Sequence, residues 1–185
     1  MKKRRFLLSF LFSFNGMMYE LMLSQNLSAA LGGTLLRYFI TIGLFTLCLG
    51  SSALVFDYFP EKYKSVSYLY RINLFFVVGL LFLPIYFYTA ELLLGKNLLS
   101  YTVFQYVYHA PLIVIALVTG FEIPYLFHGQ ADDRKSQILA FDYVGMFLAC
   151  LAFPLLFIEN LGLFGSFAFI LALQGLTVWL LKVLV

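Results

Sequence analysis

The chain has 185 residues, of which 63% are hydrophobic and only 11% are charged, with a formal net charge of +3. This balance excludes an ordinary water-soluble domain, since such domains carry far more charged side chains. Six helices of about 20 residues, each able to cross about 30 Å of hydrocarbon, would use most of the chain. We therefore predict one all-α, polytopic membrane domain over residues 1–185, with the lipid bilayer as its surroundings and no room for a soluble enzyme domain.

The first predicted helix begins directly after a basic segment, Lys2 to Arg5, and resembles a signal peptide. No cleavage site of small residues follows, so we expect the helix to be retained. Later apolar stretches are continuous enough to satisfy their backbone groups only as helices. The six predicted transmembrane helices cover about 6–30, 35–56, 69–89, 101–127, 138–158 and 164–181.

Basic residues indicate the orientation, because cytoplasmic ends of membrane helices are enriched in Lys and Arg. With a cytoplasmic N-terminus only Arg37 and Lys96 lie outside, and ten basic residues lie inside: Lys2, Lys3, Arg4, Arg5, Lys62, Lys64, Arg71, Arg134, Lys135 and Lys182. We predict that both termini are cytoplasmic and that the membrane is a bacterial inner membrane.

Ionisable side chains inside the apolar stretches are the candidate ligand-binding residues, since a charge in lipid is costly and usually functional or paired. Glu20 falls in the outer half of the first helix, and Arg37 enters the second helix from the outer side. One interpretation is an ion pair that fixes the helix register. The other is a substrate or proton site.

Glu122 and Asp142 fall near the cytoplasmic ends of the fourth and fifth predicted helices, which a short loop joins. At a shared depth, two carboxylates attract a cation or amine, or share a proton. Alternatively, each caps a helix end or binds Arg134 or Lys135.

Other polar and small residues carry weaker indications. His109 lies within an apolar helix and is a further ligand candidate, although such a histidine is more often hydrogen-bonded in the interior. Cys48 and Cys150 show no metal-binding or disulfide spacing, so we predict no metal and no cofactor. Gly43 and Gly50, one heptad apart, suit close helix packing, either within the chain or in a homo-oligomer.

Four short motifs in successive helices resemble a known family: NGMMYE at 15–20, LCLGS at 47–51, GFEIP at 120–124 and DYVGM at 142–146. Together they resemble the membrane domain of the spermidine synthase-like integral membrane proteins. The resemblance implies a bundle similar to half of a major-facilitator-type transporter, placed before a cytoplasmic aminopropyltransferase domain. Nothing in this sequence resembles that domain's glycine-rich nucleotide loop or paired aspartates, so we expect the catalytic domain to be absent and assign no enzymatic activity to this chain alone.

Three functions follow as hypotheses. The first is a membrane subunit that anchors or assists a separate soluble aminopropyltransferase-like protein at the cytoplasmic face. The second is a small transporter or carrier for a polyamine, another small cation or a lipid, with two copies around a central path and Glu20 and Glu122 as binding carboxylates. The third is a membrane scaffold subunit. No nucleic-acid partner is expected. A polar cavity that reaches Glu122 and Asp142 would favour binding, and a closed interior with Glu20 beside Arg37 would favour scaffolding.

Overall fold

The computed structural model describes residues 2–33 and 35–183, and these residues form helices joined by short connections, without a strand among them. The predicted all-α class is confirmed. Residues 1, 34, 184 and 185 of the predicted domain lie outside the described residues. The elements are α1 (Lys2–Leu31), α2 (Leu35–Phe56), η1 (Glu61–Tyr63), α3 (Val66–Leu81), α4 (Leu83–Gly95), α5 (Tyr101–Phe127), α6 (Asp132–Ala152), η2 (Phe153–Ile158) and α7 (Glu159–Lys182).

Among the described residues, length and composition allow four helical segments to cross a membrane, and five if α3 and α4 together form one bent span. The predicted helix 69–89 is in fact this pair, which bends by 42°. The bend has a local cause: Pro84 lies in the first turn of α4 and has no N–H to donate back to the preceding turn.

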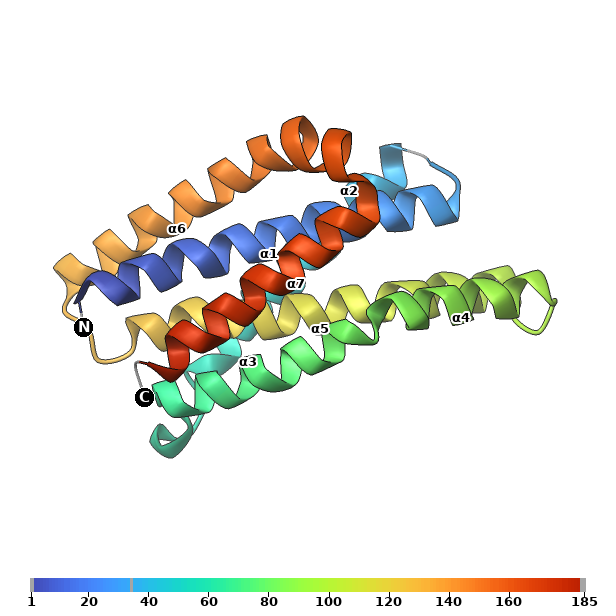
Figure 1. Ribbon diagram of the computed structural model, residues 1–185. Helices are drawn as coiled ribbons and strands as arrows, with labels where there is room; N and C mark the ends of the chain where they lie inside the picture. The colour runs from blue at the N-terminus through green and yellow to red at the C-terminus, as the bar shows by residue number, and fades with distance from the viewer. Residues whose placement is uncertain (1, 34, 184–185) are drawn as a thin grey trace.

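One of the four segments, 132–182, changes direction within its length, although helical hydrogen bonds continue on both sides of the turn. Gly162 has φ 65° and ψ −172°, a conformation that only glycine adopts readily. The chain turns back on itself here, so α6 with η2 and α7 run in opposite directions (Figure 1). The predicted helices 138–158 and 164–181 correspond to these two arms.

Both ends of the described chain lie at the same end of the bundle (Figure 1). The Arg4 guanidinium donates to the Val183 carbonyl oxygen at 3.4 Å. The loop between α2 and α3 reaches the same end, because the Tyr125 hydroxyl near the end of α5 donates to the Tyr63 carbonyl oxygen at 2.9 Å. We call this the terminal end. Ten of the twelve basic residues fall in the segments gathered there, and Arg37 and Lys96 lie at the opposite end.

Two glycines allow the closest helix contacts. A Cβ atom at Gly145 of α6 would lie 2.5 Å from the Phe10 carbonyl oxygen of α1, and one at Gly120 of α5 would overlap the Leu49 backbone of α2. Gly43 and Gly50, by contrast, have nothing within 4 Å of such an atom. Packing within the described chain therefore uses glycines other than the heptad pair.

Candidate functional site

A cavity of about 580 Å³ opens between α1, α2, α5 and α6 and extends to the terminal end. On α1 its lining residues are Ser13, Gly16, Met17 and Glu20, which repeat at the spacing of one helix face. Facing elements contribute Glu122, Asp142 and Asp57. Three of the five predicted ligand candidates, Glu20, Glu122 and Asp142, therefore line one cavity. We call it the central cavity.

Asp142 is held by the neighbouring helix. Its carboxylate accepts a hydrogen bond from the Ser13 hydroxyl, and its side chain is 5% exposed. One turn earlier on α1, the Ser9 hydroxyl donates to the Ile138 carbonyl oxygen at 2.8 Å. The two serines fix α1 against α6 and orient the Asp142 carboxylate in the cavity wall. Lys135, a predicted partner of Asp142, pairs with Asp132 at 2.9 Å.

Glu122 is the most deeply buried of the three carboxylates, at 2% exposed. Its Oε1 atom has no hydrogen-bond partner among the described residues. The amides of Asn73 and Gln174 lie within hydrogen-bonding reach of the Glu122 side chain. A buried carboxylate oxygen without a donor is costly, so this atom has unused capacity for a ligand N–H.

The two amides belong to a polar chain across the bundle. The Gln174 Nε2 atom donates to Asn73 Oδ1 at 2.6 Å, and the Asn15 Nδ2 atom donates to Gln174 Oε1 at 2.8 Å and to Thr177 Oγ1 at 3.3 Å. All four side chains are buried. We call Asn15, Asn73, Gln174 and Thr177 the amide network; it joins α1, α3 and α7 behind Glu122.

Glu20 and Arg37 occupy different surroundings. Glu20 is 8% exposed and faces the cavity. Arg37 donates to the Tyr101 hydroxyl at 2.7 Å at the opposite end of the bundle. The ion pairs in the described part of the chain join Glu61 to Lys64 and His128, and Asp132 to Lys135, and do not include Glu20 with Arg37.

His109, the fifth candidate, lies outside the cavity. Its Nδ1 atom lies 2.7 Å from the Gln105 carbonyl oxygen, so the histidine forms a hydrogen bond within its own helix. Within residues 2–33 and 35–183, no three His, Cys, Asp or Glu side chains are grouped to hold a metal ion.

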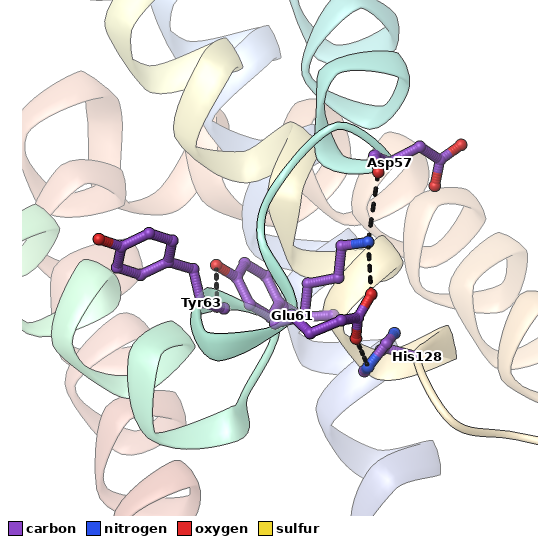
Figure 2. A network of polar contacts seen from close by, with 6 residues as sticks. Asp57, Glu61, Tyr63 and His128 are labelled. Atoms are coloured by element: carbon purple, nitrogen blue, oxygen red, sulfur yellow. Dashed lines mark hydrogen bonds and ion pairs between the residues drawn. The ribbon is translucent and has the colours of Figure 1, made fainter.

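A cluster of polar contacts, two of whose residues, Asp57 and His128, line the cavity, lies at the terminal end (Figure 2). Glu61 of η1 accepts from Lys64 at 3.0 Å and pairs with His128 Nε2 at 3.2 Å, and Lys64 also donates to the Asp57 carbonyl oxygen at 3.3 Å. The hydrogen bond from Lys64, together with the positive charges of Lys64 and His128, lowers the pKa of Glu61 below its ordinary value. We call Asp57, Glu61, Lys64 and His128 the mouth cluster. It attaches the loop after α2 to the end of α5.

Sequence reasoning from ionisable residues missed Ser13 and the amide network. A usable signal was present, since Asn73 and Gln174 interrupt strongly apolar stretches. An amide in lipid must find partners, so such interruptions indicate interhelical hydrogen bonds.

The fold and cavity thus define a helical protein with several helices apolar enough to span a membrane and a carboxylate-lined cavity. The chain is distantly similar to curated polyamine aminopropyltransferases. It is 28% identical over 170 residues to the Polyamine aminopropyltransferase of Leptospira interrogans. The aligned region covers 89% of this chain and 32% of that protein. It is 29% identical over 173 residues to Polyamine aminopropyltransferases 1 and 2 of Ralstonia nicotianae, with 90% and 32% covered.

The chain therefore spans about a third of the length of the curated relatives that it matches. No family model matches it. No solved structure matches it.

Proposed function

We propose that this chain is a bacterial inner-membrane domain that binds an organic cation of the polyamine class in its cavity and serves an aminopropyltransferase-like partner at the terminal end. The observation that carries the proposal is the presence of Glu20, Glu122 and Asp142 in one cavity. The distant similarity to polyamine aminopropyltransferases supports the choice of cation.

The charges of the cavity favour a cation. Four carboxylates line it, those of Glu20, Asp57, Glu122 and Asp142, against one lysine, Lys135, which already pairs with Asp132. Buried carboxylates need compensating positive charge, and a bound ammonium group supplies it.

The spread of these carboxylates favours a cation with more than one charge. Ser13, which holds Asp142, and Glu20 are seven residues apart on α1, or about 10 Å along the helix axis at about 1.5 Å per residue. Apolar side chains such as Met17, Phe45 and Leu49 line the cavity between the polar groups. Charged groups separated by apolar wall suit a polyamine, whose ammonium groups are separated by methylene chains.

Calorimetric titration of spermidine into the purified protein in lipid nanodiscs tests the proposal. We expect Glu122→Gln and Asp142→Asn each to weaken binding by about tenfold, as expected for a lost charge-assisted contact of about 1.5–3 kcal/mol. Glu159→Gln, at an exposed carboxylate outside the cavity, is the matched control. Unchanged spermidine binding in both cavity variants would refute the proposal.

The partner at the terminal end is tested separately by cross-linking in mild detergent followed by purification. The expected outcome is co-purification of a soluble aminopropyltransferase-like protein. If none is recovered while spermidine binding persists, the carrier hypothesis is favoured, because its central requirement is only the cation site. Uptake of labelled spermidine into proteoliposomes, lost in Glu20→Gln, then distinguishes a carrier from a binding domain.

The scaffold hypothesis expects a closed interior. The cavity that reaches Glu122 and Asp142 supports binding, and the hydrogen bond of Arg37 to Tyr101 gives no support to the Glu20–Arg37 pair that would favour a scaffold.

A further inference from the structure

The opposite end of the bundle contains another carboxylate, Glu91 of α4, which none of the sequence motifs includes. Glu91 and Asn26 of α1 line two adjoining cavities of about 150 and 480 Å³. These cavities lie between α1, α4, α5 and α7, on the far side of α1 from the central cavity. The packed interior around Tyr19, Leu23 and Leu112 separates the two regions.

A fully buried tyrosine orients Glu91. The Tyr108 hydroxyl of α5 donates to Glu91 Oε1 at 2.6 Å and accepts from Asn26 Nδ2 at 3.5 Å. The position of α4 against α5 is fixed nearby, since the Tyr86 hydroxyl donates to the Val107 carbonyl oxygen at 2.8 Å. The carboxylate is therefore positioned by Tyr108, whose hydroxyl also accepts from Asn26 of α1.

Aromatic rings line the cavities that Glu91 lines. Phe87 and Phe104 pack against the Tyr108 ring with centroid distances of 4.6 and 4.9 Å, and Phe164 and Phe167 of α7 line the smaller cavity. A carboxylate beside several aromatic faces is the arrangement that recognises organic ammonium groups, because the rings attract the cation while they exclude water.

The charge of Glu91 lacks compensation within the described chain. None of the ion pairs there involves Glu91, and the hydrogen bond from Tyr108 is neutral. Glu91 is exposed at the edge of these cavities, within an apolar helix, and a cation beside it would compensate its charge.

We propose that Glu91, Tyr108 and Asn26 form a second ammonium-binding site, at the end of the bundle opposite the central cavity. The ligand is a primary ammonium group attached to an apolar chain. Two sources offer this chemistry: a free alkylamine, and the amine headgroup of a lipid such as phosphatidylethanolamine.

The experiment uses the full chain with its central site disabled by Glu122→Gln and Asp142→Asn, so that failure of the proposed function does not affect the result. Butylammonium chloride is titrated calorimetrically into this double variant in phosphatidylcholine nanodiscs. We expect binding that Glu91→Gln weakens by about tenfold and Tyr108→Phe by a smaller factor. Glu159→Gln, at an exposed carboxylate at the same end, should leave the affinity unchanged.

Nanodiscs that also contain phosphatidylethanolamine distinguish the two sources. Competition that weakens butylammonium binding identifies the lipid headgroup as an occupant, and unchanged binding identifies a free amine; either result supports the site. Equal affinity with and without Glu91→Gln, in variants that elute and unfold like their parent, would overturn it. An equal loss in Glu159→Gln would also overturn it, by showing attraction to surface charge alone.

Discussion

Asp142 on α6 accepts a hydrogen bond from Ser13 on α1, and this bond joins the two helices inside the central cavity. The contact gives Ser13 a role in orienting a binding carboxylate as well as in helix packing.

Replacement of Ser13 by alanine should therefore weaken cation binding. The bond is already present in the free protein, so its loss acts on affinity only through the orientation of the Asp142 carboxylate, and we expect spermidine affinity to fall severalfold, less than in Asp142→Asn. Calorimetric titration measures the change. Ser51→Ala is the matched control, because the Ser51 hydroxyl bonds only within its own helix, to the Leu47 carbonyl oxygen. Equal affinities in the Ser13 variant and the control would show that Ser13 serves packing alone.

Alanine at Gly145 should destabilise the bundle. The added Cβ atom would lie 2.5 Å from the Phe10 carbonyl oxygen, so α1 and α6 must separate. Overpacking of this kind costs about 1–3 kcal/mol, measurable as a lower midpoint in thermal or denaturant unfolding in detergent. Gly175→Ala on α7 is the control, since nothing lies within 4 Å of its Cβ position. A Gly145 variant as stable as this control would contradict the close approach of α1 and α6.

Leucine at Gln174 should break the amide network. The Asn73 Oδ1 atom would lose its donor, at a cost of about 1–3 kcal/mol for a buried group left unsatisfied, while Asn15 Nδ2 would keep its bond to Thr177. We expect a lower unfolding midpoint, together with altered spermidine affinity because Glu122 loses a neighbour. The same substitution at exposed Gln137 should change neither property. Stability equal to that of the parent would indicate that the network contributes no net energy.

The mouth cluster makes a prediction about pH. The hydrogen bond from Lys64 lowers the pKa of Glu61, so this carboxylate keeps its charge to a lower pH than an ordinary glutamate does. Its contribution to stability is fully present above the unfolded-state pKa and is lost as the pH falls through the lower folded-state pKa. The Glu61 side chain is largely exposed, so we expect a small effect on overall stability.

Carbon-13 NMR titration of labelled glutamate measures this directly. Lys64→Met should raise the pKa of Glu61 towards its ordinary value. Lys62→Met should leave it in place, since Lys62 lies over the Tyr63 ring at 4.7 Å. If Glu61 has the same pKa in the parent protein and in both lysine variants, Lys64 does not lower that pKa.

The sequence was sufficient to predict the helical class and the grouping of Glu122 with Asp142, because apolar stretches of span length and a short connecting loop constrain both. It did not predict the bend at Pro84, since a proline in a membrane helix either kinks it or begins a new one, and tertiary contacts decide which. The role of Glu20 was open for a related reason: its depth on α1 was predictable, but which face of α1 meets α2 and α5 depends on packing. Gly145 and Gly120 were indistinguishable from Gly43 in sequence, because close approach is a property of two helices and not of one.

The bonds that join α1 to α6 and α7 have a consequence for how the chain assembles during synthesis. Asn15 meets Gln174, and Arg4 meets Val183, only after α7 has been synthesised. Contacts so distant in sequence form late. Until then α1 holds an amide without its final partner, so the packing of α1 is completed only when α7 folds back against it.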